Sequence, residues 1–302
     1  MSALPFVDAH MHMWDLGRLR YAWLTPPFSD SGPNGNVAPI AKTYLLDDYL
    51  AEAAKWNVIG VVHVEAGAPA AQSLEETDWL QGMAAERGMP SGIVAFATLN
   101  HPNIDVHLAA QAERRLVRGI RHIVNWHQDP QRTYTPRDVT RDETWAHGFR
   151  LLAKYDLSFD LQAYPAQFSN LAELMAAQPE TSVIINHAGQ GVDPGAEGAA
   201  EWRLGMKALA ALAHVSVKIS GLGFAYRPWN AAAARDRVRE TIDLFGVERC
   251  MFASDFPTDR LFASFDETLT MLSEAVSDFS ESDRRALFAR NANRIYRLGL
   301  SV

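Results

Sequence analysis

Cysteine is almost absent from this chain: Cys250 is the only one among 302 residues. Since a disulfide needs two cysteines, no disulfide can form within the chain. A chain without disulfides suits a reducing compartment, and we expect a cytoplasmic protein. Cys250 begins an apolar stretch, so we interpret it as a core residue rather than as a nucleophile.

Long apolar runs and clusters of basic residues are missing as well. No stretch approaches the roughly 18 apolar residues of a membrane-spanning helix. The N-terminus lacks the charged and then apolar segments of a secretory signal. The 28 Lys and Arg residues are outnumbered by 36 Asp and Glu residues, which gives a net charge of −8. We therefore expect a small-molecule substrate and neither nucleic acid nor a membrane as a partner, with a homo-oligomer left open.

Eight apolar stretches, each followed by a stretch of helical character, are spread along the whole chain. The predicted strands are Leu4–Trp14, Val58–Ala66, Gly92–Leu99, Gly119–Asn125, Ser158–Ala163, Ser182–His187, Val215–Ser220 and Cys250–Ser254. Continuous apolar runs of this kind are typical of parallel strands buried on both faces. Residues 1–302 are therefore predicted to form one α/β domain, a single (β/α)8 barrel of the TIM type. The alternative, a doubly wound open sheet, is disfavoured because no GxGxxG motif follows a strand.

The connections that leave the predicted strands are longer than those that enter them. Asp15–Thr43 is the longest and contains several glycines and prolines. In a barrel these connections share the C-terminal face, where such folds build their sites. We expect the site on that face and Asp15–Thr43 as its lid. A last helix is predicted over Glu281–Leu298, capped by Ser280 and ended by Gly299.

Polar side chains recur at the carboxyl ends of the predicted strands. They are His10, His12, His63, Glu65, Arg121, His122, Asp160, Gln162, His187, Lys218, Ser220 and Asp255. Charged groups are costly to bury unpaired, so their recurrence predicts a common site. Residues two apart on a strand point the same way, and His10 and His12 could therefore act on one metal ion or one carbonyl oxygen. His63, His122 and Lys218, taken singly, are equally well explained as satisfied core residues.

Six segments in chain order carry a resemblance to a known family. They are Val7–Trp14, Arg118–His122, Asn186–Gly189, Val217–Leu222, Ala253–Pro257 and Asn291–Tyr296. Together they resemble the amidohydrolase superfamily, and within it the amidohydrolase-2 group of sugar-lactone lactonases and 2-pyrone-4,6-dicarboxylate lactonase. The resemblance implies a hydrolase of carboxylic esters built on a (β/α)8 barrel.

The resemblance also limits the metal content. Binuclear members of the superfamily carry a carboxylated lysine on strand four and a histidine on strand five. The predicted strands Gly119–Asn125 and Ser158–Ala163 have neither. At most one divalent ion, zinc before other metals, is therefore implied, held by His10, His12, His187 and Asp255. Some relatives work without metal, so metal-independent catalysis stays open.

The residue types suggest how such a site would work. Asp255 would act as the general base that takes a proton from water, while His10, His12 and His187 would polarise the carbonyl group. The residues expected to bind substrate are Arg121, His122, Glu65, Trp14 and Lys218. A sugar-acid lactone is the expected substrate, because its ring ester is more reactive than an amide. The alternatives are a decarboxylase or hydratase of the same group and a barrel that binds a ligand without turnover.

Overall fold

The computed structural model describes residues 4–191, 193 and 195–302, and its centre is an eight-stranded parallel sheet with the strand order β1 to β8. The strands are β1 Pro5–Met11, β2 Asn57–Val64, β3 Gly92–Phe96, β4 Val117–Arg121, β5 Ser158–Leu161, β6 Val183–Ile185, β7 Val215–Ile219 and β8 Cys250–Phe252. Consecutive strands pair in chain order, and the predicted (β/α)8 barrel is confirmed.

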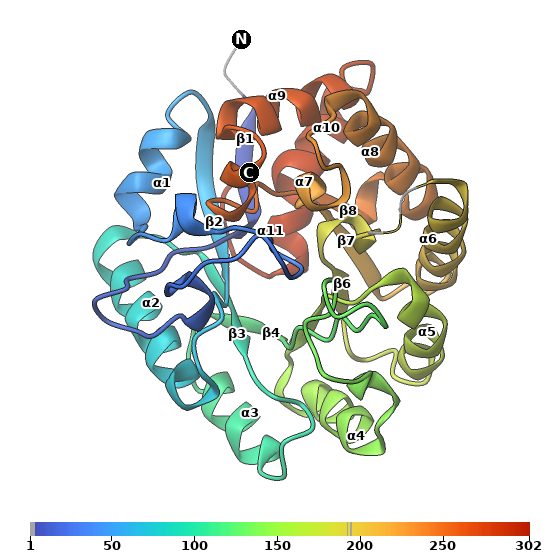
Figure 1. Cartoon of the computed structure of the whole chain (residues 1–302). Coiled ribbons are helices and arrows are strands. Elements are labelled where there is room, and N and C mark those ends of the chain that lie inside the picture. Colours follow the sequence, from blue (N-terminus) through green and yellow to red (C-terminus); the bar gives the residue numbers. More distant parts are fainter. Residues whose placement is uncertain (1–3, 192, 194) are drawn as a thin grey trace.

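Most of the helices surround this barrel on its outside (Figure 1). The helices are α1 Leu46–Glu52, α2 Ser73–Arg87, α3 Ile104–Ala112, α4 Glu143–Leu151, α5 Phe168–Ala176, α6 Gly195–Ala210, α7 Leu222–Ala225, α8 Ala231–Phe245, α9 Phe265–Ala275, α10 Glu281–Arg285 and α11 Asn291–Ile295. Among the residues that the structure describes, no helix is both long enough and apolar enough to span a membrane.

Between β8 and β1 the barrel is closed by a few hydrogen bonds rather than by a continuous ladder of paired strands. The amide of Asp255 donates to the carbonyl oxygen of His10 at 2.8 Å, and the amide of His12 donates to that of Phe256 at 2.7 Å. The carboxylate of Asp8 adds two bonds, because it accepts from the amide of Ser254 at 2.9 Å and from its hydroxyl at 2.5 Å. Asp8 therefore joins the two strands that carry the expected catalytic residues.

Among the described residues, two apolar clusters make up the core. The larger one packs the outer faces of the strands against the helices. The smaller one contains inward-facing strand residues such as Val62, Ile184 and Met251, together with Ala289, Ala292 and Tyr296 of the C-terminal segment. Because both faces of each strand are buried, the sequences of the strands are continuous apolar runs.

The C-terminal segment corrects the expectation of one helix over Glu281–Leu298. It begins as predicted, because the hydroxyl of Ser280 accepts from the amide of Asp283 at 3.1 Å. The α-helix then gives way to a π-helical turn over Ala286–Arg290 before α11 resumes. The wider turn suits the packing against the barrel: Phe288 contacts the rings of Phe6 and Phe252 at centroid distances of 5.9 and 4.9 Å.

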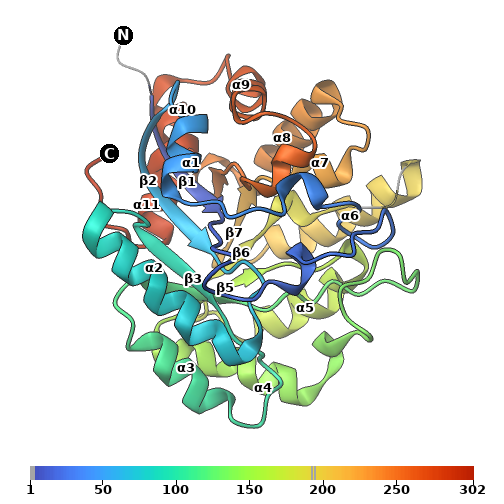
Figure 2. The same ribbon diagram turned by 60° about the vertical axis from the view of Figure 1, so that its left-hand side comes forward.

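The segment between β1 and α1 is an extended loop with short helical turns, drawn in dark blue in Figure 2. Loops that follow three strands, β2, β4 and β7, hold it by hydrogen bonds. Nε1 of Trp23 donates to the carbonyl oxygen of Ala66 at 2.8 Å, and Asn34 accepts a bond from Tyr134 at 2.5 Å. Nη2 of Arg227 donates to the carbonyl oxygen of Pro33 at 3.1 Å. This segment, residues 15–43, is called the lid loop below.

Candidate active site

A pocket of about 200 Å³ lies where the carboxyl ends of the strands meet the lid loop. Its lining residues are His12, Trp23, Asn34, Ala66, Gly67, Arg121, Ile123, Tyr134, Gln162, His187, Gln190, Phe224, Asp255 and Thr258. The volume lies below the roughly 300 Å³ at which pockets for drug-sized ligands begin. The pocket therefore suits one small ring.

An irregularity in β1 turns both histidines of the first strand into the barrel. Val7 and Ala9 belong to the interior cluster, and Met11 packs outside. Strict alternation from Ala9 would turn His10 outward. The pairing with β2 shifts between Asp8 and Met11, however, and His10 and His12 both reach Asp255. Such irregularities commonly re-aim side chains at active sites.

Unusual backbone conformations place the other two members of the cluster. His187 follows β6 with φ 55°, and Asp255 follows β8 with φ 56°. Positive φ is uncommon for residues other than glycine, and it is tolerated mainly where the surrounding structure enforces it. Gly221, after β7, leaves the space that the His187 ring needs: a Cβ at Gly221 would come within 2.4 Å of Nδ1. These turns direct both side chains into the pocket.

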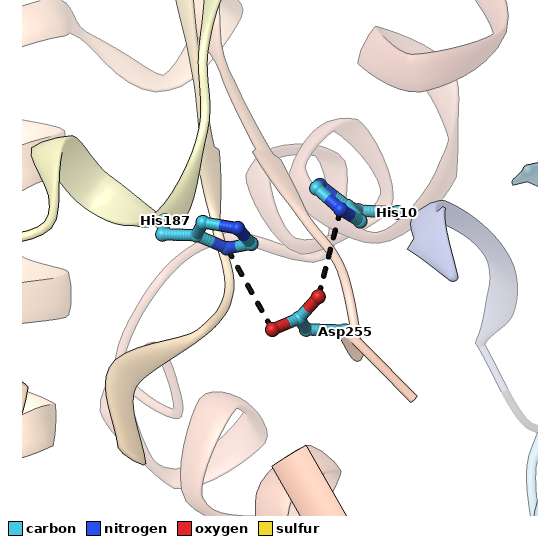
Figure 3. A group of neighbouring side chains, drawn as sticks. All are labelled: His10, His187 and Asp255. Atoms are coloured by element: carbon cyan, nitrogen blue, oxygen red, sulfur yellow. Dashed lines mark ion pairs between the residues drawn. The ribbon is translucent and has the colours of Figure 1, made fainter. Parts of the chain in front are cut away.

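Three of the four expected metal ligands form one compact group. Ligand atoms of His10, His187 and Asp255 all lie within 4.8 Å of one another, and Figure 3 shows the carboxylate facing both rings. Nε2 of His10 lies 3.5 Å from Oδ1 of Asp255, and Nδ1 of His187 lies 3.9 Å from Oδ2. The fourth residue, His12, places Nε2 3.3 Å from Oδ1 of Asp255.

Burial dominates the electrostatics of this cluster. It lowers the pKa of His12 to about 3 and that of His187 to about 4. The pKa of His10 falls well below its usual value, through burial and then through the positive charge of Lys218. Burial raises the pKa of Asp255, against the opposing influence of His187. The histidines are therefore neutral near pH 7, which is the form that binds metal.

The hydrogen-bond pattern of the cluster fits a bound cation. Nδ1 of His12 lies 2.8 Å from the carbonyl oxygen of Val64, so it must carry the ring proton of the neutral histidine. A lone pair on Nε2 then faces the carboxylate oxygen of Asp255 at 3.3 Å. Two acceptors at this distance repel each other unless a cation or a proton lies between them. Imidazole nitrogens with a carboxylate oxygen are a donor set that zinc accepts.

Arg121 and Glu65, both expected to bind substrate, form a buried ion pair at the pocket. Nε of Arg121 donates to Oε1 of Glu65 at 2.7 Å, and Nη2 donates to the backbone carbonyl of Glu65 at 2.6 Å. Nη1 donates to Oε1 of Gln162 at 2.9 Å. Arg121 and Gln162 line the pocket, whereas Glu65 lies outside the lining and is 1% exposed.

The structure does not bring His122, Lys218 or Trp14 to the pocket lining. Nδ1 of His122 accepts from the amide of Leu99 and from Nε1 of Trp145, both at 3.3 Å, on the outer side of the barrel. Lys218 is fully buried inside the barrel, with Nζ 2.5 Å from Oδ2 of Asp160. Trp14 stacks behind His12 at a centroid distance of 6.4 Å. Their neighbours give all three a packing or pairing role.

Tyr134, Gln190 and Asn34 line the pocket but were not expected from the sequence. The hydroxyl of Tyr134 donates to Oδ1 of Asn34 at 2.5 Å, and Gln190 accepts from Asn125 at 3.2 Å. All three lie in loops, where neither helical nor strand periodicity indicates which side chain turns inward. The only sequence feature that pointed to these three residues was their place in the long loops at the carboxyl ends of the barrel strands.

A (β/α)8 barrel with three neutral histidines around one buried aspartate at its carboxyl end is an arrangement that can activate water to attack a small molecule. The chain belongs to the amidohydrolase family, since the model described as "Amidohydrolase" (Amidohydro_2) matches residues 7–298. The resemblance seen in the sequence is thereby confirmed, and the chain is a hydrolase that is similar to proteins named as lactonases.

Individual relatives agree with this assignment. The chain is 40% identical over 299 residues to the uncharacterized protein y4mH of Sinorhizobium fredii, covering 99% of this chain and 100% of the relative. It is 27% identical over 312 residues to an L-fucono-1,5-lactonase of Burkholderia multivorans, covering 99% and 97%. A crystal structure of an amidohydrolase from Burkholderia multivorans with bound zinc shares the fold, with a TM-score of 0.80 at 24% identity over 97% and 99% of the two chains.

Proposed function

We propose that this hydrolase opens a small, neutral sugar-acid lactone to the corresponding hydroxy acid. The observation that carries the proposal is the buried carboxylate of Asp255, which faces His10, His12 and His187 at the wall of a small pocket. A carboxylate whose pKa is raised by burial is a better base than an exposed aspartate. Amides and aromatic rings, rather than free charges, supply most of the remaining wall.

The chain's own residues would divide the reaction between them. Asp255 orients a water molecule towards the lactone carbonyl carbon and takes one of its protons as the new C–O bond forms. The ring C–O bond then breaks, and the proton held on Asp255 passes to the departing alkoxide oxygen. The Arg121 guanidinium lies at the same wall and can stabilise negative charge on the substrate.

His10, His12, His187 and Asp255 would hold one divalent ion, with zinc the first choice. When bound, such an ion polarises a carbonyl group and lowers the pKa of water. His12 is held in the ligand-competent tautomer by its bond to Val64, whichever metal is loaded.

The polar part of the pocket that lies away from Asp255 suits ring hydroxyls. Asn34, Gln190 and Tyr134 offer both donors and acceptors without a formal charge. Trp23 and Phe224 add flat apolar walls. The relative named L-fucono-1,5-lactonase supports a deoxy-sugar lactone as the first compound to test.

A substrate panel read with a pH indicator tests this proposal. The purified protein, as isolated, after chelation and after zinc addition, is given L-fucono-1,5-lactone and further aldonolactones, and the uncatalysed rate is subtracted. Amides, phosphoesters and 2-pyrone-4,6-dicarboxylate complete the panel, with carbon dioxide release followed in parallel. Fastest acid release from a neutral aldonolactone is expected. Amide cleavage or carbon dioxide release without lactone opening would contradict the proposal and favour an amidase or a decarboxylase.

A further inference from the structure

Arg121 is the one permanently charged cation among the described residues that line the pocket. It is 4% exposed, so its charge acts in a poorly solvated place. An arginine at such a wall ordinarily serves as a bidentate receptor for a carboxylate. The partners of this guanidinium point to another role.

Three of the five N–H groups of Arg121 donate to oxygen atoms of the described residues, and a fourth is directed at His10. Nε binds the Glu65 carboxylate, and Nη2 binds the Glu65 carbonyl oxygen. Nη1 binds Gln162 and lies 3.5 Å from Nε2 of His10. Since a carboxylate needs two parallel N–H groups for bidentate binding, Arg121 can offer a substrate only one hydrogen bond. One donor suits a hydroxyl group or a ring oxygen.

Glu65 is held firmly where it cancels the guanidinium charge. Its Oε2 accepts from the amide of Gly67 at 2.8 Å, while Oε1 binds Arg121 at 2.7 Å. Glu65 is itself outside the pocket lining, so a ligand would meet the arginine but not its counter-ion directly. A carboxylate entering beside Arg121 would therefore gain no net attraction there and would also approach Asp255.

We infer that Glu65 determines charge selectivity: through its ion pair with Arg121 it makes the pocket accept a neutral ring and reject a carboxylated one. The inference rests on the proposed function, because it takes the pocket for the substrate site. Glu65 acts through Arg121 and is a positioning residue. Specificity here is a difference of affinities between two ligands of the same shape.

Pyroglutamate and pyroglutamide of the same configuration are suitable probes, since these five-membered lactams differ in charge but hardly in shape. Titration calorimetry of the purified protein after chelation, so that no bound cation attracts the carboxylate, gives the two dissociation constants and their ratio without turnover. The natural protein should bind the carboxamide more tightly than the carboxylate. Tighter binding of the carboxylate would overturn the inference at once.

Two single substitutions should move this ratio in opposite directions. Glu65→Gln keeps an acceptor for Nε but removes the counter-charge. It should therefore raise the affinity for pyroglutamate relative to that for pyroglutamide at least about tenfold. Arg121→Gln leaves the Glu65 charge uncompensated. It should therefore lower the affinity for pyroglutamate relative to that for pyroglutamide. If Glu65→Gln fails to fold, the opposite shift of Arg121→Gln still tests the inference.

Glu76→Gln is the matched control, because Glu76 is a neighbouring buried carboxyl that binds Tyr21 and the amide of Ala66 instead of Arg121. It should leave the ratio unchanged. A ratio in Glu65→Gln within about threefold of the natural value would contradict the inference, and so would an equal shift in the control. Failure of all proteins to bind either probe would contradict it too, because a freed guanidinium should capture the anion. Lactone hydrolysis measured on the same preparations tests the proposed function separately.

Discussion

Nε2 of His12 lies 3.3 Å from Oδ1 of Asp255, while the other nitrogen of the same ring is bound to the carbonyl oxygen of Val64. The neutral histidine therefore directs a lone pair at a carboxylate oxygen. Burial favours this neutral form, because it lowers the pKa of His12 to about 3. The pair thus has the arrangement of two ligands that share one cation.

This relationship predicts the metal content. Protein purified without chelator should hold no more than one equivalent of zinc or a similar divalent ion by elemental analysis. Asp255→Asn should hold clearly less than the natural protein, because the carboxylate touches every other ligand. His122→Gln, on the outer side of the barrel, is the control and should hold as much as the natural protein. Two tightly held equivalents would refute the single-site account.

The buried pair of Lys218 and Asp160 should matter for stability. Lys218→Met leaves the Asp160 carboxylate buried without its cation and should lower the free energy of unfolding by about 3–5 kcal/mol. The double variant Lys218→Met and Asp160→Asn should recover part of that loss. Lys154→Met, which breaks an exposed pair with Asp105, should cost no more than about 1 kcal/mol. Urea unfolding measures all three, and equal losses for the buried and exposed lysines would contradict this reasoning.

Glu76 should make stability depend on pH. Burial raises its pKa from 4.5 to about 8, so between these values the folded state keeps a proton that the unfolded state has lost. The stabilisation from this group is complete below pH 4.5 and is lost as the pH rises through about 8. Glu76→Gln cannot ionise, so its stability relative to the natural protein should increase by at least about 2 kcal/mol between pH 5 and pH 9. A pH-independent difference between the two proteins would disprove the raised pKa.

Tyr134 should affect substrate binding more than folding. Its hydroxyl bridges the lid loop at Asn34 and lines the pocket, so Tyr134→Phe loses one hydrogen bond at the pocket wall. We expect the KM for an aldonolactone to rise about three- to tenfold, the range of one hydrogen bond, with the melting temperature nearly unchanged. Tyr155→Phe removes a hydroxyl bond to Asp105 elsewhere and is the control. An unchanged KM in Tyr134→Phe would show that this hydroxyl and its bond to the lid loop take no part in substrate binding.

All eight strands could be predicted, because burial on both faces leaves a continuous apolar run. Their ends could not. The first strand was expected over Leu4–Trp14 but spans Pro5–Met11. Trp14 is as buried as the strand residues, so the sequence pattern does not separate it from them, yet it lies beyond the strand and packs under the lid loop. The π-helical turn in the C-terminal helix has no local signal either. It follows from how Phe288 packs against two strands far away in sequence.

The candidate site could be predicted only in part. His10, His12, His187 and Asp255 were expected to share one site, but the shift in β1 and the positive φ values that bring them together are set by tertiary structure. Arg121 ends β4 and His122 follows it directly, and the two side chains face opposite sides of the barrel wall, so alternation along the strand already opposes a shared pocket role.

The central claim is that Asp255 is the base of a lactonase, and one comparison tests it most directly. Initial rates of L-fucono-1,5-lactone hydrolysis are measured for the natural protein and for Asp255→Asn after each is shown to fold. With the uncatalysed rate subtracted, the substitution should lower kcat by at least about 100-fold, the scale of lost general-base catalysis. Near-natural turnover by a folded Asp255→Asn protein would contradict the account.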